Sequence, residues 1–106
     1  MKRRITLADI EQQVALLNTI TGSPMTPWSK LETPEGGHTM SANIGNYHVS
    51  QQYGGVCIHR MHSAGGGVST PIFYGHLPKR DAFNRLVAFI QGVSIHSWDA
   101  LSHSAS

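Results

Sequence analysis

The sequence predicts an α+β fold: an N-terminal helix, a central antiparallel β-meander of three or four strands, and a C-terminal helix packed on one sheet face. Two observations predict this fold. Apolar residues recur with helical spacing near both ends of the chain, and polar and apolar residues alternate on either side of Gly54 and Gly55. The length of 106 residues suits one domain. We expect residues 3–93 to form it and residues 94–106 to be a polar, flexible tail.

Apolar residues at intervals of three and four predict the first helix. Thr6 and Asp9 form a capping-box pattern at its start, and Gly22 is placed to end it near Ile20. Its expected buried face consists of Leu7, Ile10, Val14, Leu17 and Thr21, widened by Leu16 and Ile20. Residues 22–37 contain three prolines and three glycines, which predicts an irregular loop with Met25 and Trp28 packed back on the body. We expect a short strand over residues 38–44.

The segment around Gly54 and Gly55 predicts a β-hairpin with a two-residue Gly-Gly loop. That loop pairs Tyr53 with Val56, and it sets the pairing of the residues that follow: Gln51 with Ile58 and Val49 with Arg60. Side chains alternate between the two faces of a strand. The more apolar face, expected to meet the helices, carries Tyr47, Val49, Gln51, Tyr53, Val56, Ile58, Arg60 and His62. The polar face carries His48, Ser50, Gln52, Cys57, His59 and Met61.

A third strand is expected over residues 68–75, at an edge or bulged because Pro71 cannot donate to a ladder. The second helix follows, with Pro78 at or near its first position and Gly92 as its stop. Its expected buried stripe is Ala82, Phe83, Leu86, Phe89 and Ile90.

Composition narrows the class of protein. The formal charge is +2 and charged residues are 13% of the chain, so little charge repulsion opposes association and we expect a homo-oligomer. No apolar run approaches the ~20 residues of a membrane span. The single cysteine, Cys57, excludes an internal disulfide. These features predict a cytoplasmic protein without a membrane partner.

Three segments resemble small uncharacterised proteins encoded by tailed bacteriophages and prophages. They are "RRITLADIEQQVALLNTITGSP", "GNYHVSQQYGGVCIHRM" and "YGHLPKRDAFNRLVAFIQG", within residues 3–92. The resemblance implies a phage accessory protein that acts in the host cytoplasm, in host takeover or against host defence. Such proteins often block a host enzyme or a host defence, and some sequester a nucleotide signal as a sponge. It supplies no functional residues.

The residues give little support to catalysis or to a cofactor. His48, Cys57 and His59 share the polar face and could approach a zinc ion, but a fourth ligand is missing and no metal-binding spacing is present. Cys57 and His59, two apart on a strand, lie ~6–7 Å from each other, too far for direct proton transfer. The six carboxylates fall mostly at helix starts and in loops. We expect a protein that is not an enzyme and has no cofactor.

The start of the second helix is a candidate anion site, and the alternative is an ordinary solvated first turn in which Asp81 offsets the cations. His76 precedes it, and Lys79 and Arg80 occupy its first turn, where acidic residues are usual. Gly54 and Gly55 could bring backbone N–H groups to a ligand, as could residues 65–67. Arg60, His48 and His59 complete the candidate contacts. The aromatic residues that could stack a base are Tyr47, Tyr53, Tyr74, Trp28 and Phe73, and we expect the core to leave at most two of them free.

We therefore expect a non-enzymatic protein that binds a phosphate-bearing small molecule, a nucleotide signal in class. One alternative is an inhibitor that binds a host protein directly, through a sheet edge or the histidine-rich face. A further alternative is a DNA- or RNA-binding protein, which gains support if the basic N-terminus (Lys2, Arg3, Arg4) meets Lys79 and Arg80 in space.

Overall fold

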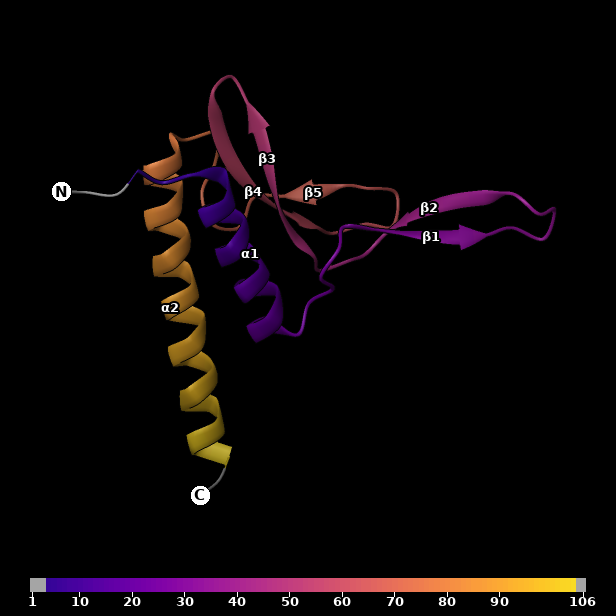
Figure 1. Ribbon diagram of the computed structural model, residues 1–106. Coiled ribbons are helices and arrows are strands. Elements are labelled where there is room, and N and C mark those ends of the chain that lie inside the picture. Colours follow the sequence, from indigo (N-terminus) through magenta and orange to yellow (C-terminus); the bar gives the residue numbers. More distant parts are fainter. Residues whose placement is uncertain (1–3, 105–106) are drawn as a thin grey trace.

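The computed structural model describes the backbone of residues 4–104 and the side chains of residues 4–95. It confirms an α+β fold with a helix at each end of the described chain and antiparallel sheets between them (Figure 1). The two helices lie side by side against the larger sheet, and a β-hairpin extends from the opposite side. The elements are α1 (Leu7–Thr21), β1 (Trp28–Glu32), β2 (His38–Ala42), β3 (Tyr47–Gln52), β4 (Gly55–Met61), β5 (Val68–Ser69) and α2 (Lys79–Ser104).

Helix α1 begins and ends where its capping residues predict. Thr6 and Asp9 form the reciprocal capping box, with the Thr6 N–H donating to the Asp9 carboxylate over 2.8 Å. Gly22 ends the helix in the left-handed conformation, at φ 67°. The buried face is narrower than predicted, because Leu16 and Ile20 are exposed. Its buried residues are Ile10, Val14, Leu17 and the polar Asn18.

The prediction of an irregular loop over residues 22–37 is wrong for residues 28–32, which form β1. Strand β1 pairs with β2 from Trp28 opposite Ala42 to Glu32 opposite His38, and the two form a separate two-stranded sheet. Pro27 and Pro34 lie just outside the ends of β1, so neither removes a ladder hydrogen bond.

Met25 and Trp28 are more exposed than predicted, at 56% and 40%. Trp28 still lies against the backbone of the loop after β4, because a Cβ added at Gly66 would be 2.8 Å from its ring. The hairpin is therefore attached to the body at its base and extends into solvent beyond it (Figure 1).

The β3–β4 hairpin exists, but its turn lies one residue earlier than predicted. Gln52 pairs with Gly55, so Tyr53 and Gly54 are the turn residues, at φ 54° and 75°. Positive φ at both positions is the type I′ pattern, which right-handed strand twist favours. Gly55 belongs to β4 and is buried, and an added Cβ would lie 3.1 Å from both the His76 Cβ and the Leu77 carbonyl oxygen. Close approach of backbone, rather than the turn, explains this glycine.

The corrected pairing sets Val49 opposite Ile58 and His48 opposite His59. Pairing moves by two residues along the partner strand, so both predicted faces keep their members and only the direct neighbours change. Tyr53, placed on the apolar face, instead lies at the turn and is 94% exposed.

The third strand is shorter than predicted. Strand β5 has two residues, and the chain from residue 70 onward returns to β4 through one bridge, in which Val56 and Leu77 exchange backbone hydrogen bonds of 2.8 and 2.9 Å. Proline at position 71 limits the ladder, as expected.

Helix α2 does not stop at Gly92 but continues to Ser104. A helical glycine costs about 1 kcal/mol relative to alanine without breaking the helix, and nothing crowds this position. The predicted division into a domain over residues 3–93 and a flexible tail remains a prediction.

The core lies between the helices and the apolar face of the larger sheet. Helix α2 contributes the predicted stripe: Ala82, Leu86 and Ile90 are buried, and Phe83 and Phe89 pack against them. The remaining buried members are Ile10, Val14, Leu17, Tyr47, Val56, Ile58 and Phe73, together with Cys57, which is buried from the opposite face of the sheet, the one predicted to be polar.

Candidate functional site

The starts of the two helices border one hollow of about 240 Å³, called the basic hollow below. Its lining consists of Arg4, Ile5, Thr6, Leu7 and Lys79. Two basic residues thus line it, and among the described residues the lining contains no carboxylate, although the Asp9 carboxylate accepts from the N–H of the lining residue Thr6. The amino end of α2 adds partial positive charge and carries Asp81 in its first turn, whereas the Asp9 carboxylate caps the amino end of α1. This arrangement attracts an anion.

The β3–β4 turn lies at the same end of the molecule as the starts of both helices (Figure 1). Gly55, next to the turn, packs against His76, three residues before Lys79. Two tyrosines flank this contact in sequence: Tyr53 in the turn and Tyr74 before His76. They are 94% and 92% exposed, so each offers a ring face that the fold does not use. Exposed aromatic rings at the end of the molecule that carries the basic hollow are suited to stack a planar ligand.

The structure divides the predicted ligand contacts between the two ends of the β3–β4 hairpin. Lys79 lines the basic hollow, and Arg80 is exposed in the same turn of α2. Gly54 lies in the turn. His76 lies near it, and the His76 Nε2 atom is buried without a hydrogen-bond partner among the described residues.

Arg60 and Tyr47 lie at the opposite end of the hairpin, paired with each other. The Tyr47 side chain is buried in the core, so the prediction that it could stack a base is wrong. The Arg60 guanidinium stacks over the Tyr47 ring, 5.0 Å from its centroid, and its Nε donates to the Gly45 carbonyl over 3.4 Å. Arg60 therefore packs against the core at the end of the hairpin away from the turn, and it does not join the other predicted ligand contacts near the turn.

His48 and His59 face each other across the hairpin in a T-shaped contact of 5.6 Å. Burial lowers the pKa of His48, and the neighbouring His59 lowers it further. Burial likewise lowers the pKa of His59, with a smaller contribution from His76. Because the folded state lowers both pKa values, the neutral rings stabilise the fold above pH 6.5, and this contribution is lost as the pH falls through the folded values.

The polar face does not assemble the zinc site that its composition left open. Within residues 4–95, no group of three or more histidine, cysteine or acidic side chains is placed to hold a metal ion. Cys57 is fully buried, and burial raises the pKa of its thiol, while a backbone contact with Ile58 opposes the shift. Burial thus keeps the sulfur in its protonated, unreactive form at neutral pH.

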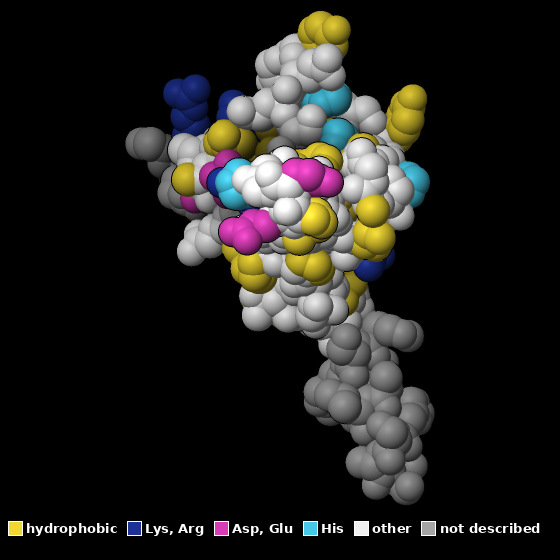
Figure 2. Space-filling view, turned by 90° about the vertical axis from the view of Figure 1, so that its right-hand side faces the viewer, with side chains coloured by type: hydrophobic (Ala, Val, Ile, Leu, Met, Phe, Trp, Pro, Cys, Tyr) yellow, Lys and Arg dark blue, Asp and Glu magenta, His cyan; other side chains and the backbone are white. Residues whose placement is uncertain are grey.

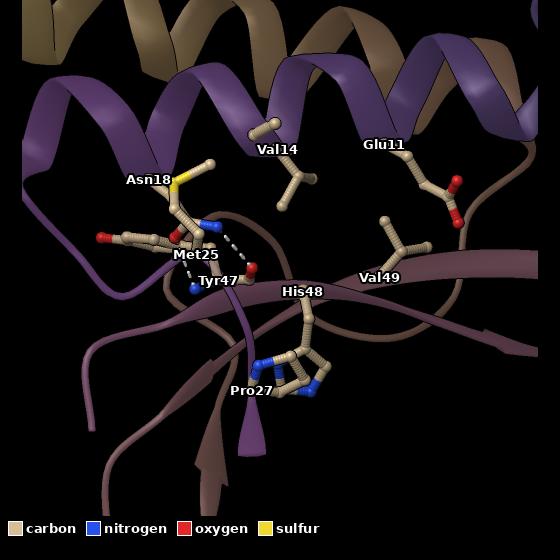
Figure 3. Close-up of a pocket in the computed structure, with 9 residues that line it drawn as sticks. Glu11, Val14, Asn18, Met25, Pro27, Tyr47, His48 and Val49 are labelled. Atoms are coloured by element: carbon tan, nitrogen blue, oxygen red, sulfur yellow. Dashed lines mark hydrogen bonds between the residues drawn. The ribbon is translucent and has the colours of Figure 1, made fainter. Parts of the chain in front are cut away.

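A second hollow, of about 250 Å³, lies between α1 and β3 (Figure 3). Val14 and Val49 face each other across it, with Glu11 toward one end and Met25 toward the other. At its floor, the Asn18 side chain accepts from the Tyr47 N–H over 2.8 Å and donates to the Tyr47 carbonyl over 3.0 Å. Among the described residues, its lining contains no lysine or arginine, and the asparagine at its floor joins α1 to β3.

We did not predict this hydrogen-bonded link between Asn18 and Tyr47 from the sequence. Asn18 follows Val14 by four residues on the apolar face of the helix, and a polar residue at such a position indicates a buried hydrogen bond. Asn46 has a similar role: it is fully buried and donates to the Pro24 carbonyl over 2.7 Å. Its Oδ1 lies 3.2 Å from the His48 Nδ1. Buried asparagines of this kind fix the fold rather than bind a ligand.

Comparisons with known proteins do not assign this site. No family model, no curated protein and no solved structure matches the chain. In the described part of the chain, no helix has the length and apolar character needed to cross a membrane.

Proposed function

We propose that this protein binds a phosphate-bearing small molecule, a nucleotide in class, at the basic hollow and does so without catalysing a reaction. The observation that carries the proposal is that Arg4 and Lys79 line one hollow at the starts of the two helices. In the phage setting that the sequence resemblance implies, such capture would sequester a host nucleotide signal.

The two cations dominate the attraction. A phosphate charge 4 Å from one cation gains about 4 kcal/mol at an effective dielectric of 20, before screening by salt. A helix amino end contributes about 0.3–1 kcal/mol at an exposed site. Removing either cation should therefore weaken binding far more than any change to the helix cap.

The volume of the hollow indicates which part of a nucleotide it receives. Sites that enclose a drug-sized ligand measure about 300–1,000 Å³, and the basic hollow, at about 240 Å³, is smaller. It suits a phosphate group and leaves the base outside. The exposed rings of Tyr53 and Tyr74 are available to the base at this end of the molecule, where one stacked base contributes about 1–3 kcal/mol.

Calorimetric titration with ADP and with inorganic pyrophosphate tests the proposal. Lys79→Gln and Arg4→Gln should each weaken binding of both probes about tenfold or more. Arg85→Gln is the matched control, because it removes one exposed cation of α2 that does not line the hollow, and its affinity should stay within about twofold. Equal affinity in Lys79→Gln and Arg85→Gln, or no binding of either probe by the wild-type protein, would refute the proposal.

Nucleic acid is a second candidate, favoured by the convergence of Arg4 with Lys79. Lys2 and Arg3 precede Arg4 in the sequence and lie outside the described residues. A nucleic-acid groove extends beyond one phosphate, so its affinity should rise steeply from ADP to a 20-nucleotide single strand and fall steeply with salt. Capture of a small nucleotide instead gives similar affinities for ADP and the strand.

A further inference from the structure

Within the described part of the chain, strand β1 pairs with β2 on one edge and with no strand on the other. The β1–β2 hairpin forms a sheet of only two strands, and such a hairpin is at best marginally stable in water without another strand or a packed face. Viewed along the hairpin toward the body, hydrophobic and acidic side chains lie together on this face of the molecule (Figure 2). The exposed hydrophobic residues of the hairpin are Trp28, Leu31 and Met40, at 40%, 49% and 56%.

The hydrogen-bond pattern shows which backbone groups of β1 face outward. The Asn43 N–H donates to the Pro27 carbonyl over 2.8 Å, so residues 27 and 43 form a bonded pair just beyond the ladder. Bonded pairs alternate along an antiparallel ladder. Ser29 and Leu31 therefore bond to β2, and the backbone groups of Trp28, Lys30 and Glu32 face away from it.

We propose that a second copy of this chain pairs with β1 along this edge, antiparallel and about a two-fold axis at Leu31. Opposite charges two residues apart make the strand complementary to itself in this register. Lys30 then lies opposite Glu32 of the partner copy, and Glu32 opposite Lys30 of the partner copy. Each pair exchanges two backbone hydrogen bonds, which joins the two hairpins into one four-stranded sheet.

Neighbouring registers are less favourable. Only residues whose backbone groups face outward can form bonded pairs, so the register can move only to a two-fold axis at another residue. An axis at Lys30 sets two lysines directly opposite each other, which is destabilising. The edge of β2 is less open, because the Ala42 N–H already donates to the Ala64 carbonyl over 3.2 Å.

The register also accounts for the exposed Leu31. This leucine is on the face of the hairpin that otherwise carries Ser29, Thr39 and Ser41, so within one chain it lacks an apolar neighbour in the ladder. At the two-fold axis it meets Leu31 of the partner copy in a non-bonded pair, where side chains approach most closely. Dimer formation thus buries the one large apolar side chain on this face.

Sedimentation equilibrium of the full-length protein with charge-reversed variants tests the proposal. The wild-type protein should dimerise. Lys30→Glu and Glu32→Lys should each raise the dimer dissociation constant about tenfold or more, because each turns two attractive pairs into two repulsive ones. The double variant Lys30→Glu with Glu32→Lys restores both attractions and should dimerise like the wild type.

A mixture of the two single variants provides the sharpest result. One chain then has two carboxylates at the edge and the other has two ammonium groups, so the mixture should form a heterodimer while each variant alone remains monomeric. The far-UV circular dichroism of all variants should equal that of the wild type, because both positions are exposed. The proposal is overturned if the wild-type protein is monomeric up to about 1 mM. At that concentration, a free energy of association of about −4 kcal/mol would already form dimers. Single variants that dimerise as well as the wild type overturn the proposal too.

Discussion

Replacing Asn18 with alanine should cost a large part of the stability of the protein. The Asn18 side chain forms two hydrogen bonds with the Tyr47 backbone, at 2.8 and 3.0 Å, and the residue is 2% exposed. Alanine leaves a buried N–H and a buried carbonyl of Tyr47 without this partner. The substitution thus breaks the polar link between α1 and β3 and leaves the apolar contacts around it in place.

The size of the effect follows from the two orphaned groups. Each buried group left without a partner costs about 1–3 kcal/mol. Water in the adjacent hollow of about 250 Å³ can satisfy part of this demand, so the lower part of the range applies. We expect a loss of about 2–4 kcal/mol in the free energy of unfolding, against a total of about 5–15 kcal/mol for a domain. The midpoint of thermal unfolding should fall by about 10–30 °C.

Urea unfolding followed by circular dichroism measures this loss. Asn84→Ala is the matched control, since it makes the same change at an exposed position of α2 and should alter stability by no more than about 0.5 kcal/mol. Asn18→Leu keeps the branched shape, leaves no cavity and should still destabilise, which separates the loss of the hydrogen bonds from a cavity effect. If Asn18→Ala unfolds at the same urea concentration as Asn84→Ala, the polar link does not hold α1 on the sheet.

Three further predictions concern single features. Lowering the pH from 7.5 to 5 should reduce the midpoint of thermal unfolding, because the folded state lowers the pKa of His48 and of His59. Replacing both histidines with glutamine should flatten this pH dependence, and an unchanged slope would contradict the assignment. The Cys57 thiol should react with a disulfide reagent only as fast as the protein unfolds, so rapid labelling of native protein would show that it is accessible. Gly66→Ala should lower stability by about 1–3 kcal/mol, since its φ is +100° and the added methyl lies 2.8 Å from an indole ring. Gly65→Ala, with open space and an ordinary φ, is the control, and equal melting of the two would contradict the reasoning.

Local signals predicted the elements whose limits are set by neighbouring residues. Thr6 and Asp9 placed the start of α1, Gly22 placed its end, and the spacing of Ala82, Leu86 and Ile90 gave the buried stripe of α2. The two faces of the β3–β4 hairpin were also predictable, because alternation is preserved when the pairing moves by two residues.

The errors arose where tertiary contacts decide. Gly55 resembles a turn residue in sequence, yet it is a glycine because His76 and Leu77 lie against it, while Tyr53 takes the positive φ that a glycine would be expected to have. Gly92 resembles a helix stop, but the helix continues through it. A local sequence pattern does not show which residues from a distant segment will contact a given position.

The candidate site was predicted in part for the same reason. Lys79 was identifiable because a cation in the first turn of a helix opposes the usual charge preference. Arg4 lines the same hollow as Lys79 because of how α1 and α2 pack. The sequence did not predict this packing and indicated only what would follow if the basic N-terminus met Lys79 and Arg80 in space. The predicted contribution of Tyr47 failed because the core uses that ring.

Two-dimensional NMR of isotope-labelled protein titrated with ADP tests the central claim most directly. Binding at the basic hollow predicts saturable shifts of the amide signals of residues 4–7 and 79–81, with smaller shifts at Tyr53 and Tyr74 and none at residues 38–42 of the distant hairpin. Shifts confined to other parts of the chain, or none at millimolar ADP, would contradict it.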